Sequence, residues 1–350
     1  MPFGKIFRTV SKVITAPIKI FSKAFSWLQP KIDIPDFSVG EFDDFEKGVL
    51  LNKQSNDAAI PVVYGTRLIG GTRVFLQTSG TDNEFLYMAL ILSEGEINAI
   101  SEIRVDDKVV TFDGSLADNT QRDVASSDSN FYKDSVSYIR IEPHFGADDQ
   151  SASSLLSTLS SWGSNHKLSG IAYLALRFKW NQDIFGTVPK VQAIIQGRKV
   201  STFNSSSVET TGQFSSNPAF CLLDYLRNER FGKGLALTDI DIPSFVQAAS
   251  DCETQVTPFS GGSDINVFDC NAVVDTSLKV IDNVREFLKG CRGYLPYTSG
   301  KYKLIIEKTG SASVTLTEDD IIGGFNLQSA DKNNKYNRVI VSYVNPARNY

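Results

Sequence analysis

The residues that could carry chemistry are few and widely spaced along the chain. Only His144 and His166 could supply an imidazole, and no G-x-S-x-G or H-E-x-x-H motif occurs. A zinc site is not predicted, because zinc ligands come from short, regular Cys and His spacings that this sequence lacks. We therefore predict no catalytic residue, no metal site and no cofactor, and we expect each histidine to be a turn or interface residue.

The cysteines are confined to one stretch and include no C-x-x-C spacing; they are Cys221, Cys252, Cys270 and Cys291. We expect them to be small buried hydrophobes of one domain. Two disulfides in a particle exported from the cell are the alternative, which stays open because spacing alone does not establish a bridge.

Adjacent acids are the remaining candidates for acid–base chemistry or calcium binding. Asp106/Asp107 and Asp148/Asp149 lack the spaced oxygen ligands of a calcium loop, so we expect turn and capping residues. The segment Gly65–Thr72 imitates a phosphate loop, but Gly71 stands where the phosphate-binding lysine would be. A strand-like run follows it where a phosphate loop would lead into a helix, so we expect no phosphate site.

Composition narrows the class of protein. The chain has 350 residues, 41% of them hydrophobic, with 35 basic and 40 acidic side chains for a net charge of −5. This balance is typical of a folded globular protein, and the length favours at least two domains. The net acidity argues against a protein that wraps duplex DNA, and we expect no sequence-specific nucleic-acid partner.

The residue pattern of the first 32 positions predicts a basic amphipathic arm. They carry six Lys or Arg and no acid, and Pro17 is expected to kink the helix. Lysines interrupt the apolar positions, which argues against a signal peptide and a membrane span. Such an arm either lies on an anionic membrane or packs in an assembly. The stripe that would make this contact consists of Ile6, Val10, Val13, Ile14, Ile18, Phe21, Phe25 and Leu28.

The predicted fold class is mainly β with α+β parts, in a multidomain chain behind the helical arm. Residues 33–200 read as a β-rich region, 201–216 as a linker or loop, 217–310 as an α+β domain and 311–350 as strands that return to it. In the β-rich region, the apolar run 85–92 predicts a strand buried on both faces, Asp106-Asp107 predicts a hairpin turn, and 149–162 predicts a helix capped by Asp149.

The α+β region contains three predicted helices. The first begins at Asn217-Pro218, the second runs from Pro243 to about Ala249, and the third follows Thr276 and stops at Gly290. The core face of the third helix is predicted to hold Leu278, Ile281, Val284 and Leu288. Residues 266–274, 293–307 and 338–344 are expected to supply strands.

A set of segments in a fixed order resembles the tail-tip hub of long, flexible-tailed bacteriophages, the tip attachment protein J family of lambda-like phages. Together these segments cover most of the chain after residue 58. They include IPVVYGTRLIGGTRVF (60–75), NEFLYMALILSEGEINAISEIRVDDKVV (83–110), the run from GADDQ to QGRKV (146–200), NPAFCLLDYLRNERFGKGL (217–235), the run from CNAVV to LIIE (270–307) and KYNRVIVSYVNP (335–346).

The resemblance implies a non-enzymatic virion protein at the distal end of the tail, made in the host cytoplasm. It implies a homotrimeric hub that closes the tail tube, contacts the distal tail protein, the tape-measure protein and other tail-tip or fibre proteins, and takes part in host attachment and genome ejection. Family members usually continue into fibronectin-like and fibre modules, whereas this sequence ends at Tyr350. Receptor binding by this chain is therefore in doubt.

Two other classes of function compete with the hub. One is a membrane-active ejection protein that contacts the host membrane through its basic arm. The other is a cell-wall hydrolase that uses Asp and Glu, which is disfavoured because no converging acid pair is evident. Within a hub, three arms on a threefold axis would bury their apolar stripes on one another or on tape-measure helices.

Overall fold

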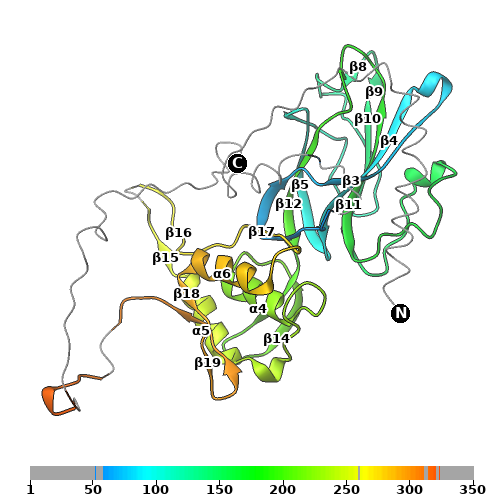
Figure 1. Cartoon of the computed structure of the whole chain (residues 1–350). Coiled ribbons are helices and arrows are strands. Elements are labelled where there is room, and N and C mark those ends of the chain that lie inside the picture. The colour runs from blue at the N-terminus through cyan, green and yellow to red at the C-terminus, as the bar shows by residue number, and fades with distance from the viewer. Residues whose placement is uncertain (1–51, 53–57, 259–260, 311–313, 321–322, 324–350) are drawn as a thin grey trace. The chain divides into compact units, whose positions relative to one another are not determined.

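The computed structural model describes residue 52 and residues 58–258, 261–310, 314–320 and 323 (Figure 1). The predicted arm at 1–32 and the predicted strand at 338–344 lie outside these residues. The chain divides into two compact units, one up to Ile306 and one from Glu307 onward. In the described residues of the second unit, the regular element is the short 3-10 helix η4 (Glu318–Asp320).

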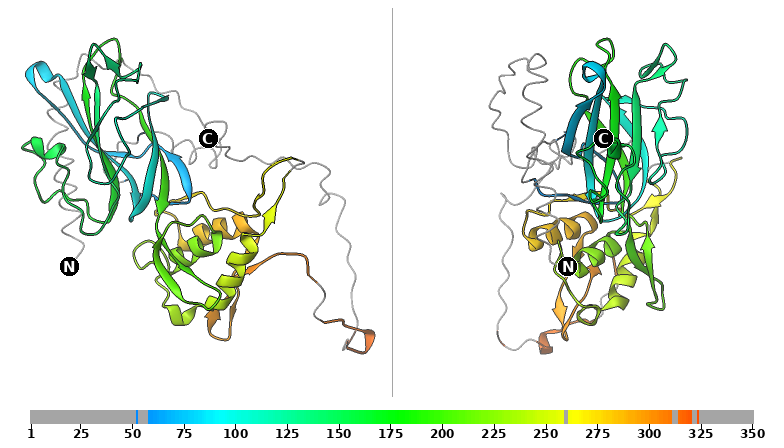
Figure 2. Two further views of the ribbon diagram at one scale, coloured as in Figure 1. Left: turned by 180° about the vertical axis from the view of Figure 1, so that it is seen from behind. Right: turned by 90° about the vertical axis from the view of Figure 1, so that its right-hand side faces the viewer.

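Two antiparallel sheets form the first half of the larger unit (Figure 2). The first sheet has the strand order β3 (Thr72–Ser79), β4 (Phe85–Glu94), β11 (Ile171–Lys179), β10 (Ile139–His144) and β7 (Arg122–Asp123). The second has the order β2 (Thr66–Ile69), β12 (Val191–Arg198), β5 (Ile97–Val105) and β6 (Lys108–Val109). The hairpin β8 (Tyr132–Lys133) and β9 (Val136–Ser137) and the 3-10 helix η1 (Thr81–Asn83) lie in the connections.

Strand β4 explains how the first sheet is buried on both faces. Alternate side chains of a strand point to opposite faces. Met88 and Leu90 belong to the core that β4 shares with the second sheet, whereas Tyr87 and Ala89 belong to a separate core on the other face. The prediction of a doubly buried strand is therefore confirmed, and the outer core is covered by the segment around Trp162.

The helical half of this unit has its own core. It contains α4 (Pro218–Arg227), α5 (Ile242–Cys252), α6 (Val280–Cys291), η3 (Leu237–Asp239), and β1 (Val62–Tyr64) paired with β17 (Ala272–Val274). Small hairpins complete it: β13 (Val200–Phe203) with β14 (Glu209–Gln213), β15 (Gln255–Val256) with β16 (Ile265–Asn266), β18 (Gly293–Tyr294) with β21 (Ile305–Ile306), and β19 (Tyr297–Thr298) with β20 (Lys301–Tyr302).

The predicted start of α4 is confirmed. The side chain of Asn217 accepts a hydrogen bond from the amide of Ala219 at 3.0 Å, and Pro218 occupies the first turn, where no amide donor is needed. Among the described residues, no helix is both long enough and apolar enough to cross a membrane. Taken together, the described residues are mainly β with α+β parts, as the sequence predicted.

The helix predicted at 149–162 is wrong. This segment consists of turns and the 3-10 helix η2 (Leu156–Thr158), although Leu155 and Trp162 are buried as the apolar pattern required. The bonds to Glu142 of β10 explain the difference. The amides of Ser154 and Leu155 donate to its carboxylate and not to the carbonyl oxygens four residues earlier, as a helix would require.

The segment predicted as a linker or loop at 201–216 contains most of hairpin β13–β14. Phe203 is buried, and the side chain of Asn204 organises the turn by accepting bonds from the amides of Ser206 and Val208, both at 3.0 Å. A run of serines therefore marked the turn of a hairpin.

Helix α6 begins later than predicted, and two of its four predicted core residues, Val284 and Leu288, pack on the core. Leu278 precedes the helix and Ile281 lies on it, with exposed fractions of 53% and 52%. Val284 and Phe287 face the core, and the helix continues through Gly290 to a left-handed residue, Arg292, at φ 54°. The predicted core role of Leu278 and Ile281 is therefore wrong. Apolar residues occur on several sides of the first turn, so their spacing there does not identify the buried face.

Candidate functional site

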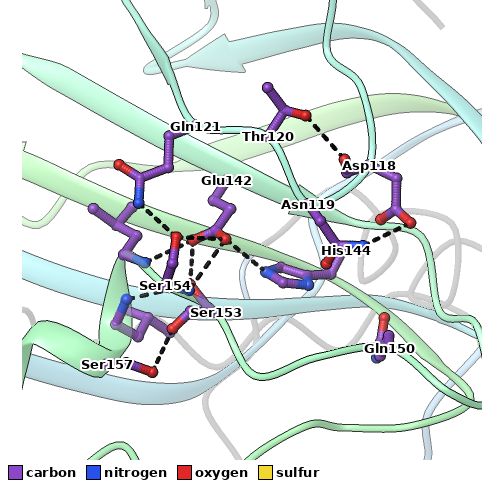
Figure 3. A network of polar contacts seen from close by, with 12 residues as sticks. Asp118, Asn119, Thr120, Gln121, Glu142, His144, Gln150, Ser153, Ser154 and Ser157 are labelled. Carbon is purple, nitrogen blue, oxygen red and sulfur yellow. Dashed lines mark hydrogen bonds and ion pairs between the residues drawn. The ribbon is translucent and has the colours of Figure 1, made fainter.

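The strongest concentration of buried polar groups lies on β10, around Glu142 and His144 (Figure 3). Ile139 and Ile141 of this strand pack in the core between the two sheets. The alternation of the strand therefore directs Glu142 and His144 to the opposite face. There they meet the serine-rich segment that follows Gln150.

Four donors surround the Glu142 carboxylate. The hydroxyl of Ser153 lies at 2.6 Å and the amide of Leu155 at 2.7 Å, while Ser154 donates its amide at 3.1 Å and its hydroxyl at 3.0 Å. Burial by itself raises the pKa of Glu142, but the interactions with His144, Ser153 and the two amides outweigh it and lower the pKa to about 2. Glu142 is therefore a carboxylate in the folded protein at neutral pH.

His144 completes the cluster without a short hydrogen bond. Its Nε2 lies 3.6 Å from Oε1 of Glu142, within ion-pair range, and its ring stacks on Tyr173 at a centroid distance of 4.3 Å. Within the described residues, neither ring nitrogen of His144 nor the hydroxyl of Tyr173 has a hydrogen-bond partner. Burial raises the pKa of the Tyr173 hydroxyl above its ordinary value.

The arrangement does not fit nucleophilic catalysis. A serine nucleophile needs a base that takes its proton, but Ser153 donates to Glu142 and not to His144. The side chains of His144 and Glu142 are 1% and 3% exposed, so a substrate has no access to them. What the cluster does is attach the segment after residue 145 to the face of the sheet.

Gln150 strengthens the same attachment. Its Oε1 accepts a bond from the amide of Gly146, and its Nε2 donates to the carbonyl oxygens of Leu168 at 2.5 Å and Ile171 at 3.0 Å. One buried amide therefore joins both ends of the segment that covers the outer core.

A second polar cluster joins the sandwich to the helical half. Asp224 of α4 accepts bonds from the hydroxyl of Tyr64 at 2.7 Å and from Nε of Arg198 at 2.8 Å. Arg230, beyond α4, pairs with Glu94 at the end of β4 at 2.5 Å. Burial raises the pKa of Glu94, and the two arginines oppose that rise. The junction is thus an electrostatic contact between the two cores.

The cysteines belong to the core of the helical half, and all of them are buried free thiols. Their prediction as buried hydrophobes is confirmed. Burial raises the pKa of Cys252 to about 12 and that of Cys291 to about 11, so both are protonated at neutral pH.

The predicted turn acids are in turns. Asp106 and Asp107 form the tip of hairpin β5–β6 with φ values of 49° and 63°, and Asp107 pairs with Lys190 at 2.8 Å. Asp148 and Asp149 are exposed in the turn before Gln150. The described residues contain no group of three or more His, Cys, Asp and Glu that could hold a metal ion.

The two histidines lie in different kinds of structure. His166 is a turn residue as predicted, with Nδ1 accepting a bond from the amide of Gly163 at 2.8 Å. His144 is not in a turn but is fully buried in β10, so that prediction is wrong. The sequence Ile-Arg-Ile-Glu-Pro-His has the alternation of a strand. This alternation was the signal that could have placed His144 in a strand. The predicted arm stripe from Ile6 to Leu28 lies outside the described residues.

Comparisons with known proteins identify relatives of one kind. No protein-family model matches the chain. The chain is 26% identical over 342 residues to the baseplate hub protein pb3 of Escherichia phage T5, a match that covers 82% of this chain and 36% of that protein. It is 24% identical over 133 residues to the tip attachment protein J of Escherichia phage SECphi27, covering 37% of this chain and 11% of that protein.

The chain thus spans about a third of the length of the T5 protein. Among solved structures, a chain in the virion of a native gene transfer agent particle matches 87% of this chain and 67% of that chain, with a TM-score of 0.49 and 12% identity. The resemblance predicted from the sequence is confirmed: the chain is related to the hub and tip proteins of bacteriophage tails and is located in the virion, at the distal end of the tail.

Proposed function

We propose that the chain is the core of a homotrimeric hub that closes the tail tube and contacts the distal tail and tape-measure proteins. In this role it takes part in host attachment and genome ejection and catalyses no reaction. The observation that carries the proposal is the relationship to the T5 hub protein across 82% of this chain.

The geometry of the polar clusters supports a structural role. The carboxylate of Glu142 is saturated by donors and shielded from solvent, and Asp224 is held by Tyr64 and Arg198. The hydrogen bonds of these groups hold segments of the chain in place. A hub needs such rigid bodies because it must hold its interfaces in register around an axis.

The basic arm would serve assembly. In a trimer, three apolar stripes at residues 6–28 would be buried on one another or on tape-measure helices, whereas a lone arm would expose them.

The mass of the purified chain in solution tests the proposal. Three chains of 38.5 kDa give about 116 kDa, so light scattering should report this value for the full chain alone, or this value plus the mass of the bound distal tail protein once that partner is added. A chain lacking residues 1–32 should assemble less well. A chain that stays at 38.5 kDa with both tail partners present would contradict the trimer.

A second function is motivated by the charge of the arm, which carries six basic residues and no acid. Membrane-active ejection predicts that the full chain binds vesicles containing anionic lipid and releases from them at high salt. Equal recovery of the full chain and of the chain lacking residues 1–32 with such vesicles would contradict it.

A further inference from the structure

Two of the buried cysteines lie in contact in the core of the helical half. Cys221 is on α4, and Cys270 lies just before β17, the strand that pairs with β1. The side chains of these two cysteines form a hydrogen bond with each other. The thiol of Cys221 donates to the carbonyl oxygen of Ser215 at 3.5 Å, and the amide of Cys270 donates to that of Ser216 at 2.6 Å. The same short stretch of backbone therefore holds both cysteines.

The two thiols differ in their access to solvent. Cys221 is completely buried, whereas Cys270 is 8% exposed, so a small reagent reaches Cys270 first. A shared metal ion is not the role of this pair, because the described residues contain no group of three or more possible ligands. The chemistry that remains for two thiols in contact is the formation of a disulfide.

The place of the chain in the virion supplies the oxidising condition. Thiols stay reduced in the cytosol, whereas disulfides form and persist at the surface of released particles. A chain at the distal end of a phage tail experiences both environments in turn.

We propose that Cys221 and Cys270 form an intramolecular disulfide in the released particle, with a small-molecule disulfide as the oxidant. The Cys270 thiolate attacks one sulfur of the reagent, whose S–S bond breaks, and the other half of the reagent leaves as a thiolate. The Cys221 thiolate then attacks the Cys270 sulfur and displaces the second half. The pair loses two electrons and two protons, and the reagent takes up both as it becomes two thiols.

The order of these two steps follows from the surroundings of Cys221. The pKa of its thiol is raised well above the ordinary value by the hydrogen bond to Cys270, by burial and by the negative charge that Cys270 can carry. Once the Cys270 sulfur is bonded to the reagent, it has neither a thiol proton nor a charge. Cys221 therefore ionises more readily after the mixed disulfide has formed than before.

The bond would close a loop over residues 222–269, which contains α5 and hairpin β15–β16. A disulfide stabilises a protein mainly by restricting its unfolded chain, and more so when the loop is long. We expect oxidation to raise the melting temperature by about 5 to 10 °C. The inference does not depend on the proposed trimer.

Treatment of the folded full chain with oxidised glutathione at pH 8 tests the pairing. The remaining thiols are alkylated in denaturant, and the chain is cut with trypsin and with a protease that cleaves after glutamate. Cleavage after Glu253 separates Cys252 from Cys270, which trypsin alone leaves on one peptide because residues 234–278 contain no Lys or Arg. We expect peptides 210–227 and 254–279 to be linked and to separate on reduction. A link from Cys270 to Cys291, a glutathione that stays on Cys270, or alkylation of both thiols would overturn the proposal.

Melting temperatures of the reduced and oxidised forms provide a second readout. The wild type and C252A should both show the rise on oxidation, whereas C221A and C270A should not. C252A is the matched control because its thiol is buried in the same core. Each variant is compared with its own reduced form, so any stability that the substitution itself removes cancels. A rise that persists in C221A or C270A would assign the stabilisation to another pair of thiols and would overturn the proposal.

Discussion

Replacing Glu142 with Gln tests how the buried carboxylate holds the covering segment. The Ser153 hydroxyl and the Leu155 amide donate to it at 2.6 and 2.7 Å, and its pKa is lowered from 4.5 to about 2. At 1.36 kcal/mol per pH unit, this lowering of about 2.5 units corresponds to roughly 3 kcal/mol of folding free energy. Because glutamine carries no charge and turns one amide group toward these donors, we expect E142Q to lose about 2 to 3 kcal/mol at pH 7.

The pH dependence has a definite sign. The folded-state pKa lies below the unfolded one, so the contribution is fully present above about pH 4.5 and is lost as the pH falls toward 2. Urea denaturation of the wild type at several pH values should show this loss, and E142Q should have a flatter profile in that window. E96Q is the matched control at a carboxylate that is 45% exposed, and it should cost less than about 1 kcal/mol. If E142Q keeps the wild-type stability at pH 7 or the wild-type slope below pH 4.5, the reasoning is refuted.

Three further predictions concern the junction, two glycines and the thiols. D224N should cost about 1 to 3 kcal/mol in urea denaturation, because it removes the charge that pairs with the half-buried Arg198; a loss below about 0.5 kcal/mol would show that the junction is not held by this pair. G197A should destabilise by about 1 to 3 kcal/mol, since its Cβ would lie 2.2 Å from a carbonyl oxygen of β1, whereas G290A, within α6 and in open space, should stabilise by about 0.5 to 1 kcal/mol; opposite signs in thermal denaturation would contradict both. Cys252 and Cys291, with pKa values raised to about 12 and about 11, should react with a thiol reagent only on unfolding, and rapid labelling of the folded chain at pH 8 would refute their burial.

The sequence predicted those elements whose signals are local. The apolar run of β4 needs two covered faces, and Asn217-Pro218 starts α4 because a cap and a proline act within one turn. The strand pairing at Asp106-Asp107 likewise follows from a turn of two residues.

The elements that the sequence did not predict depend on distant partners. An acid in a strand reads as solvent-facing, and Glu142 is buried only because the segment at 153–155 folds over it. The same bonds prevent the helix predicted there. On α6, Ile281 reads as a core residue until the packing of the other helices selects the face at Val284 and Phe287. Local periodicity thus identifies that a helix forms, whereas tertiary packing decides which face is buried.

The most direct test of the central claim is electron cryo-microscopy of intact phage particles that carry this chain. The account predicts three copies of the two-sheet and three-helix fold of residues 58–306 around the axis at the distal end of the tail tube. Density at that end that does not accommodate the fold, or a copy number other than three, would contradict the hub.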